Sequence, residues 1–173
     1  RLPHVLPYID IPLQHASDSM LRTMRRNVTA EVQSSLLTRL RESIDGVGIR
    51  TTFITGFPGE TEEDHQTLLA FIREHKFEAM GVFQYSKEEG TVAGTMEKDE
   101  SLRVPQAIKQ HREEELMLAQ QDIAFARAEQ AAIDGEKHEL LIDAYLGETG
   151  EGELHLYQCR TKQQAPDVDA STI

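Results

Sequence analysis

The stretch Arg50–Asp64, RTTFITGFPGETEED, decides the fold. Its first part, Thr51–Thr55, contains only β-branched and aromatic residues without charge, which is typical of a strand covered on both faces. Gly56 and Gly59 follow and predict a tight turn, because glycine adopts backbone angles that other residues avoid. Thr61 is a good helix N-cap, and the three carboxylates after it favour the positive end of a helix dipole. We therefore predict a buried strand, a glycine turn and a capped helix, in that order.

The segments around this stretch predict more units of the same kind. Before the Arg50–Gly56 strand we predict a strand at Pro7–Leu13, a short helix at Asp18–Arg26 and a second helix after Thr29. After it we predict a helix at Thr61–His75 and a strand at Met80–Tyr85. This alternation indicates an α/β fold with parallel strands. Three parallel strands cannot close a barrel, and Val82 and Phe83 need a covering layer. We therefore expect the N-terminal half of the domain to lie before Arg1, outside this chain.

The C-terminal part has a different organisation. Pro105 suits the start of a long helix that runs to Ile133, in which Glu113–Glu115 is expected to be a solvated face. Two alternating stretches, His138–Leu146 and Glu153–Gln158, predict strands, with a hairpin turn at Gly147–Gly152. The polar stretch Glu88–Glu100 is expected to be a loop. We predict an α/β domain over 1–100, a linker helix over 101–133 and a β domain over 134–173.

Charge limits the choice of partner. The chain of 173 residues has a formal net charge of −12, and residues 134–173 hold 3 Lys/Arg against 9 Asp/Glu. Nucleic acid is therefore an unlikely direct target, since its binding needs a basic face. A basic protein partner fits better. An acidic tail that only confers solubility remains open.

The single cysteine, Cys159, excludes an internal disulfide and fits a reducing cytoplasm, where we expect the protein to be. Cysteine-rich metal sites are excluded within these residues, and the seven histidines lack metal-like spacing, so we expect no metal ligand and no catalytic residue in this chain. No apolar run approaches 18 residues, which argues against a membrane span.

Candidate binding residues lie at the carboxyl ends of the predicted strands, which converge on one mouth in β/α folds. They are Gln14, Gly56, Glu60, Tyr85, Ser86, Glu88 and Glu89. Gln14 can donate and accept hydrogen bonds. Glu60 can accept from hydroxyls or an amine, or can simply stabilise the helix start, and both roles stay open. Arg26 can pair with a ligand carboxylate or be a solvated surface residue, whereas His15 is expected to be structural.

Three blocks together resemble the radical S-adenosylmethionine methylthiotransferases. They are YIDIPLQHASDSMLRTMRR (8–26), RTTFITGFPGETEED (50–64) and VFQYSKEEGTVA (82–93). PLQHAS at 12–17 and YSKEEGT at 85–91 look like the RimO branch, which methylthiolates an aspartate of a small-subunit ribosomal protein. The tRNA-modifying branch (MiaB-like) usually has PVQSGS and YSxRPGT there, and it remains the alternative within the class. A non-catalytic acidic module that binds a basic protein is the alternative outside it.

The resemblance implies a fold and cofactors. The chain would be the C-terminal half of a partial, TIM-like (β/α) barrel, followed by the linker helix and the start of an all-β TRAM-like barrel, to which APDVDASTI (165–173) would belong. The cofactors would be S-adenosylmethionine and 4Fe-4S clusters. The cysteines that hold the clusters are not in this chain, so the fragment alone is expected to be inactive.

The resemblance also implies roles for the candidate residues. Gln14 and Arg26 would contact or position S-adenosylmethionine. The backbone of the Ile54–Glu60 element, which includes Gly56, would contact adenine and ribose. Tyr85 and Ser86 would line the adenine, and Glu88 and Glu89 would face a basic substrate loop at the mouth.

Overall fold

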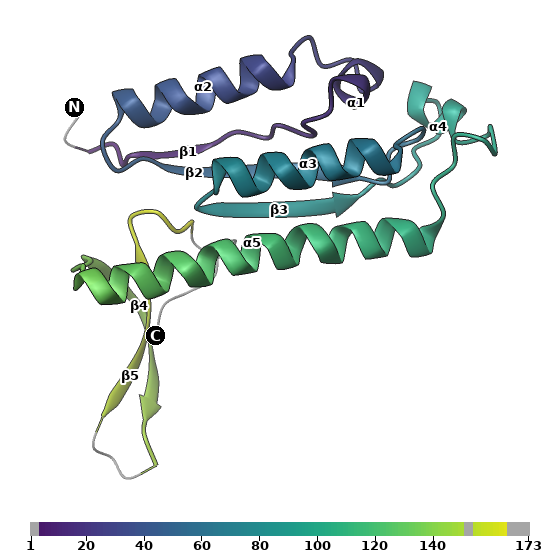
Figure 1. Cartoon of the computed structure of the whole chain (residues 1–173). Coiled ribbons are helices and arrows are strands. Elements are labelled where there is room, and N and C mark those ends of the chain that lie inside the picture. The colour runs from purple at the N-terminus through teal and green to yellow at the C-terminus, as the bar shows by residue number, and fades with distance from the viewer. Residues whose placement is uncertain (1–3, 151–153, 166–173) are drawn as a thin grey trace.

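The computed structural model describes residues 4–150 and 154–165. Three parallel strands form a sheet in the order β1-β2-β3: β1 is Tyr8–Asp10, β2 is Gly48–Thr55 and β3 is Ala79–Gln84 (Figure 1). The second, antiparallel sheet contains β4 (Leu140–Glu148) and β5 (His155–Thr161). The predicted α/β class with parallel strands is confirmed. Most of APDVDASTI and part of the hairpin turn lie outside the described residues.

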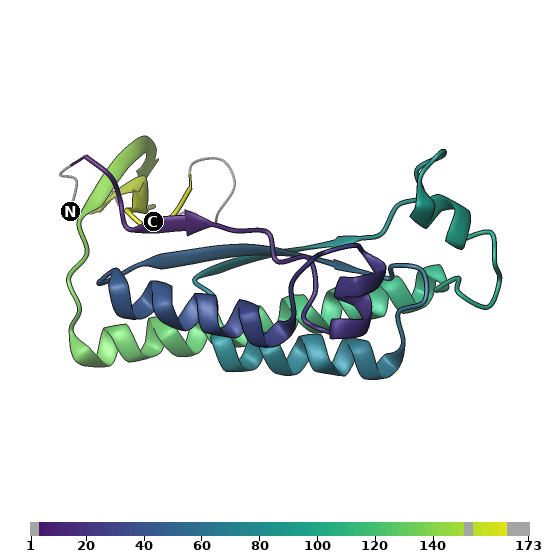
Figure 2. The same cartoon turned by 90° about the horizontal axis from the view of Figure 1, so that it is seen from above.

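Helices cover one face of the parallel sheet. They include α1 (Asp18–Thr23), α2 (Ala30–Ser43), α3 (Glu62–His75) and α5 (Gln106–Asp134), and the three long ones lie on the same side in Figure 2. Alternate β2 side chains point toward these helices: Ile49 and Phe53 are fully buried, as are Leu68 and Ile72 of α3. Burying each such side chain contributes about 1.5–3 kcal/mol, so this helix-covered face forms the core.

The other face of the sheet has no covering layer in the described part of the chain. Arg50, Thr52 and Ile54 of β2 alternate with the core residues and are half-buried. On β3, Phe83 is 63% exposed, whereas its neighbour Val82 is 7% exposed. Phe83 thus lacks a covering layer as expected, whereas Val82 was wrongly expected to lack one, because it packs in the core. The expectation that β2 is covered on both faces is also wrong for this chain. The described strands form no closed barrel.

This asymmetry predicts that substitutions at two adjacent residues differ in their effect on stability. Val82→Ala should lower the free energy of unfolding of the chain by about 1–2 kcal/mol, because it leaves a cavity in the core. Phe83→Ala should change it by less than about 0.5 kcal/mol, since most of the ring is already in water. Urea denaturation of both variants measures the difference. Equal losses would contradict the placement of Phe83 on an open face.

The long helix α5 lies along the sheet beside β3 and α3. It follows Pro105 and ends at Gly135, a left-handed C-cap with φ +64°. Leu116 is fully buried, and Gln120 Nε2 donates to Phe77 O at 2.9 Å. The first half of α5 therefore belongs to the packed core, while Phe125 and Ile133 near its end are exposed. The predicted linker role and the domain boundaries remain predictions.

The hairpin of β4 and β5 presents apolar side chains to solvent. The exposed ones are Leu140, Leu141, Ile142, Tyr145, Leu146, Leu154, Leu156 and Tyr157. Cys159 in β5 is buried, and its thiol lies 3.7 Å from Tyr157 O. A two-stranded hairpin is marginal by itself, so these two strands form only a small β unit here.

Three segments differ from the sequence prediction. β1 stops at Asp10 rather than Leu13, because Pro12 cannot donate to a neighbouring strand. Beyond Asp10, Ile11 N still donates to Arg50 O at 2.9 Å, and an isolated bridge joins Gln14 to Phe53 of β2. The helix predicted to reach Arg26 ends at Thr23. The stretch expected as a loop contains a short helix, α4 (Val92–Met96), capped by Thr91, whose hydroxyl accepts from Gly94 N at 2.9 Å.

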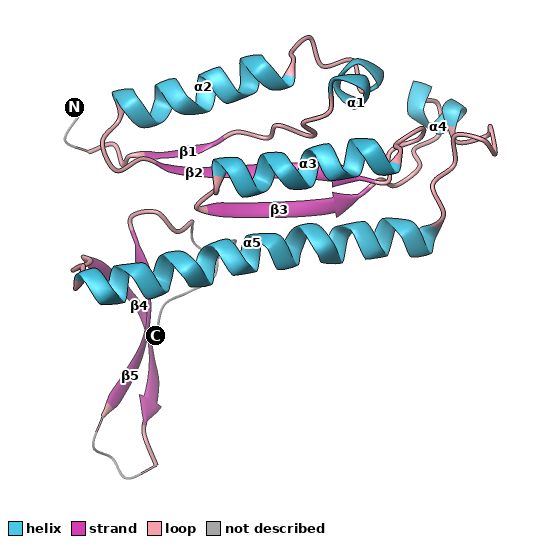
Figure 3. Cartoon of the chain, in the orientation of Figure 1, coloured by secondary structure: helices cyan, strands magenta, loops and turns pink. Residues whose placement is uncertain are grey.

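Figure 3 shows the parallel sheet and the antiparallel β4–β5 hairpin as two separate sheets. Among the described helices, none combines the length and the apolar composition needed to cross a membrane.

Candidate functional site

The carboxyl ends of the three parallel strands meet at one edge of the sheet. Ile54 N donates to Gln14 O at 2.8 Å, which joins the end of β2 to the segment after β1. Tyr85 N donates to Thr55 O at 2.8 Å, which joins the end of β3 to β2. Ligands bind at this edge in α/β folds. Gln14, Ile54, Gly56, Glu60, Tyr85 and Ser86 all lie on the segments that form it.

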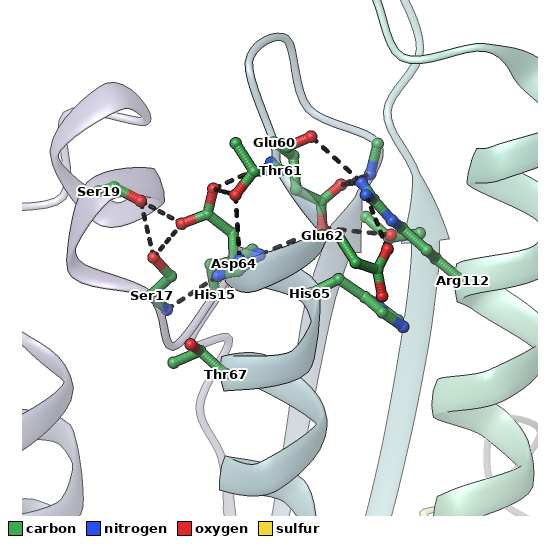
Figure 4. Close-up of polar contacts among 12 residues, drawn as sticks. His15, Ser17, Ser19, Glu60, Thr61, Glu62, Asp64, His65, Thr67 and Arg112 are labelled. Atoms are coloured by element: carbon green, nitrogen blue, oxygen red, sulfur yellow. Dashed lines mark hydrogen bonds and ion pairs between the residues drawn. The ribbon is translucent and has the colours of Figure 1, made fainter.

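A buried carboxylate stands at the centre of this edge. Glu60 precedes the N-cap of α3, and its side chain is fully buried. Its Oε1 lies 3.3 Å from His15 Nε2, and its Oε2 lies 3.2 Å from Arg112 Nη1. Its Oε2 also accepts a hydrogen bond from Gly56 N. Figure 4 shows His15 and Arg112 approaching Glu60 from different elements. Glu60 is thus satisfied within the chain, and its carboxylate closes the glycine turn.

His15 is bonded at both ring nitrogens. Ser17 N donates to His15 Nδ1 at 2.9 Å, so Nδ1 is an acceptor and Nε2 holds the hydrogen that points to Glu60. The ring has no exposed surface. His15 therefore ties the loop after β1 to the loop after β2, which agrees with the structural role expected for it.

Arg112 extends this network to α5. Its Nη1 also donates to Glu60 O at 3.3 Å, and its Nη2 donates to Glu62 Oε2 at 3.3 Å. Its side chain is only 6% exposed. Sequence reasoning missed Arg112. The available signal was its position four residues before the apolar Leu116, on the same face of the helix.

Lys109 occupies the space beside Gly56. Gly56 has φ +72°, and a Cβ placed there would lie 2.3 Å from Lys109 Cγ. The Nζ of Lys109 donates to Tyr85 O at 3.1 Å and lies 3.4 Å from Glu97 Oε1. The close approach that the glycine permits is therefore made by a side chain of α5. Sequence reasoning also missed this residue.

Tyr85 has a polar group without a protein partner. Its ring packs edge-on against Phe57 with centroids 5.1 Å apart, and Lys109 Nζ lies 5.0 Å from its centroid. Burial raises the pKa of the Tyr85 hydroxyl, and the carboxylates of Glu97 and Glu88 raise it further. This hydroxyl is buried and has no hydrogen-bond partner among the described residues. Such a group is available to a polar atom of a ligand.

A second carboxylate network lies beside the first. Asp64 accepts hydrogen bonds from the hydroxyls of Ser17 and Ser19 and from both the hydroxyl and the backbone N of Thr61. With Thr61 it completes a capping box at the start of α3. Burial alone would raise the pKa of Asp64, but the donors from Ser17, Ser19 and Thr61 outweigh it and lower the pKa to about 2. Asp64 therefore fastens α1 to α3.

The lowered pKa of Asp64 predicts a pH-dependent contribution to stability. The folded pKa lies below the ordinary value of 3.8, so the contribution is fully present above pH 5 and is lost as pH falls toward 2. Asp64→Asn should cost about 2 kcal/mol of unfolding free energy at pH 7 and clearly less at pH 3. Urea titrations of both proteins at the two pH values measure this. A difference independent of pH would contradict the proposed donor network.

The other predicted residues lie around this edge. Arg26 is exposed, and its Nη2 donates to Pro12 O at 3.1 Å, which places it near the segment before Gln14. Ser86, Glu88 and Glu89 are exposed on the loop between β3 and α4. The structure thus brings the predicted residues to one side of the domain. Their contacts with a cofactor or substrate remain predictions.

The described residues contain no group of three or more His, Cys, Asp or Glu side chains suited to a metal ion. The single cysteine of the sequence lies in the hairpin, in β5. An iron–sulfur cluster requires several cysteine thiolates, so the residues of this chain do not fit such a cluster.

Comparison with known proteins identifies relatives of the chain by sequence. No protein-family model matches the chain. Curated relatives cover it almost completely: one from Anaeromyxobacter sp. (strain K) is 44% identical over 170 residues, 98% of this chain and 34% of the relative. One from Lachnoclostridium phytofermentans is 46% identical over 162 residues, 94% of this chain and 34% of the relative. One from Microcystis aeruginosa is 46% identical over 167 residues, 96% of this chain and 36% of the relative.

The chain is thus similar, over almost its whole length, to proteins named as methylthiotransferases. All three relatives have the name ribosomal protein uS12 methylthiotransferase RimO. The chain spans about a third of the length of these curated relatives.

Proposed function

We propose that this chain is part of a radical S-adenosylmethionine methylthiotransferase that modifies the β-carbon of an aspartate in a small-subunit ribosomal protein. The relatives name uS12 as their substrate. The main support is the identity of 44% over 98% of the chain. The geometry is consistent with it, because the three blocks that resemble this class end at the same edge of the sheet.

The architecture of the proposal follows the sheet. Residues 1–100 would form half of a partial β/α barrel, 101–133 the linker helix and 134–173 part of a TRAM-like β domain. The open face with Ile54 and the exposed Phe83 would then be the inner face of the barrel. Further strands of a longer protein would complete it, which would also cover the free edges of β1 and β3.

Residues at the edge would hold S-adenosylmethionine. The orphaned hydroxyl of Tyr85 and the neighbouring Ser86 would face the adenine, and this buried unpaired hydroxyl is the structural support for a fit. The Gln14 side chain and the Ile54 backbone would contact the ribose, and Arg26 would position the methionine part. Gly56 and Glu60 would contribute through the shape of their turn. After one-electron reduction by an iron–sulfur cluster of the full enzyme, bound S-adenosylmethionine would supply the radical that removes a hydrogen atom from the substrate carbon.

The iron–sulfur clusters of this class would be held outside the present residues, since the only cysteine is Cys159. The chain's own contribution is to bind and orient the cofactor and to meet the substrate. Glu88 and Glu89, both exposed, would face a basic loop of the ribosomal protein. A cytoplasmic location is part of the proposal, because a single free thiol suits a reducing compartment.

A chimera tests the function. The present chain replaces the 170 matched residues of the Anaeromyxobacter relative, and the purified chimera is reconstituted with iron and sulfide. Mass spectrometry then follows methylthiolation of uS12 and, in parallel, of tRNA. Modification of uS12 alone is the expected result. Appreciable activity on tRNA alone would instead support the tRNA-modifying alternative.

Two further experiments examine the isolated chain. It should not cleave S-adenosylmethionine when iron and sulfide are added, because it lacks the cluster cysteines; cleavage would contradict the proposal. The acidic-module alternative is supported by the charge of residues 134–173. A pull-down with uS12, with and without these residues, separates the two: salt-sensitive binding that needs only residues 134–173 would favour the module.

A further inference from the structure

Helix α5 places two basic side chains at the proposed cofactor site. Lys109 and Arg112 lie about one turn apart near its N-terminus, and their side chains are 7% and 6% exposed. Burying a basic group costs free energy unless it forms hydrogen bonds or ion pairs, so each of these side chains needs such partners. Arg112 fastens α5 to the Glu60 turn. Lys109 reaches a different part of the edge.

Lys109 makes four kinds of contact there. Its Nζ donates to the backbone carbonyl of Tyr85, and it lies near the Tyr85 ring face. Glu97, whose side chain is 13% exposed, accepts from the same Nζ. The aliphatic stem fills the space that the missing Cβ of Gly56 leaves. Lys109 therefore touches both the turn after β2 and the segment after β3.

We propose that Lys109 is a positioning residue that holds Tyr85 and Ser86 in place as the wall of the adenine pocket. This inference rests on the proposed function, in which those two residues line the adenine. Lys109 itself would not contact the cofactor, because its Nζ is buried and bonded to Tyr85 O and Glu97. It would act by fixing the Tyr85 carbonyl, and with it the direction in which the chain leaves β3.

Because Lys109 lies on α5, its contact with Tyr85 also links the proposed pocket to the β4–β5 hairpin. The same helix ends at Gly135, five residues before β4 begins at Leu140. One wall of the pocket is therefore held by the helix that also connects to the hairpin. A displacement of α5 would move Lys109 away from Tyr85 and loosen the adenine wall.

Lys109→Met in the chimera tests the proposal. Methionine keeps an unbranched stem beside Gly56 and removes the donor to Tyr85. Loss of a charge-assisted hydrogen bond predicts a KM for S-adenosylmethionine raised by about 10–100-fold, with kcat lowered less than about threefold. The inhibition constant of 5′-methylthioadenosine, which presents only the adenosine part and a thioether, should rise by the same factor. The matched control is Lys137→Met, at an exposed lysine beyond the end of α5.

The outcomes separate the two proposals. If the unsubstituted chimera fails to cleave S-adenosylmethionine, the proposed function is wrong. If it cleaves the cofactor and Lys109→Met lowers only kcat, or leaves both constants unchanged, the positioning role is wrong. If Lys109→Met does not fold, Glu97→Gln replaces it, because it removes the carboxylate that holds Nζ. That variant should raise KM about threefold, and an unchanged KM would overturn the inference.

Discussion

Glu60→Gln is expected to lower the unfolding free energy of the chain by about 3–5 kcal/mol, because removing one member of a buried ion pair leaves an uncompensated charge. Arg112 would lose its carboxylate partner at 3.2 Å, while its side chain stays 6% exposed. The amide of glutamine would also turn a donor toward Gly56 N or His15 Nε2, each of which donates to Glu60 in the native protein. Urea denaturation monitored by circular dichroism measures the loss.

A control variant and a double-mutant cycle test whether this loss of stability comes from the Glu60–Arg112 pair. Glu129→Gln changes an exposed carboxylate on α5 and should alter the unfolding free energy by less than about 0.5 kcal/mol. Glu60→Met combined with Arg112→Met removes both charges, and the pair should cost less than the sum of the two single changes. Additive losses would show that Glu60 and Arg112 are not coupled.

Gly56→Ala is expected to cost about 2–4 kcal/mol, the sum of a left-handed backbone at a residue with a Cβ and an overpacked contact. The backbone has φ +72°, and the added methyl group would lie 2.3 Å from Lys109 Cγ and 2.7 Å from Lys109 Cδ. Both atoms belong to the buried part of the lysine stem, so they cannot simply swing into water. The same denaturation assay measures the cost.

Gly46→Ala is the matched control for the backbone term. Gly46 has a similar φ of +68°, but no atom lies within 4 Å of the added Cβ. It should cost only about 1–2 kcal/mol, the left-handed penalty alone. The difference between the two alanine variants then measures the contact with Lys109. Equal costs would mean that the lysine stem moves aside freely.

The local features of Arg50–Asp64 were predictable from sequence. The strand, the turn and the cap all occur: β2 ends at Thr55, and Asp64 N donates to the Thr61 hydroxyl at 3.2 Å. The apolar residues at helical spacing in α3, Leu68, Leu69 and Ile72, are all buried. These features depend on neighbours in the chain, such as the spacing of apolar residues and the hydroxyl before a helix.

The features that the sequence did not predict depend on distant pairs. Glu113–Glu115 was expected to be solvated, but Glu113 accepts from Gln84 Nε2 at 2.5 Å and Glu115 lies 2.8 Å from His65 Nε2. Only Glu114 is fully exposed. Which face of α5 meets the sheet is set by its packing against α3 and β3, and the sequence of the helix alone did not reveal it.

The candidate site also has one part that the sequence predicted and one part that it did not. Its location at the strand ends followed from the parallel order of the elements, and Gln14, Gly56 and Tyr85 were found from it. The groups that hold it together, Lys109 and Arg112, lie 53 and 52 residues after the Gly56 and Glu60 that they contact. Charged residues on a helix are usually solvated, so their burial becomes visible only in three dimensions.

Helix α5 is tied to the sheet at both ends by side chains on one face. Lys109 holds the carboxyl ends of the strands, while Arg127 Nη2 donates to Lys76 O at 2.9 Å, just before β3 begins. The two anchors are 18 positions apart in the helix, which corresponds to about 27 Å. A single residue inserted between them would rotate one anchor by about 100° relative to the other, so both could not be kept. The two contacts with the sheet therefore fix both the number of residues between Lys109 and Arg127 and the face of α5 that meets the sheet.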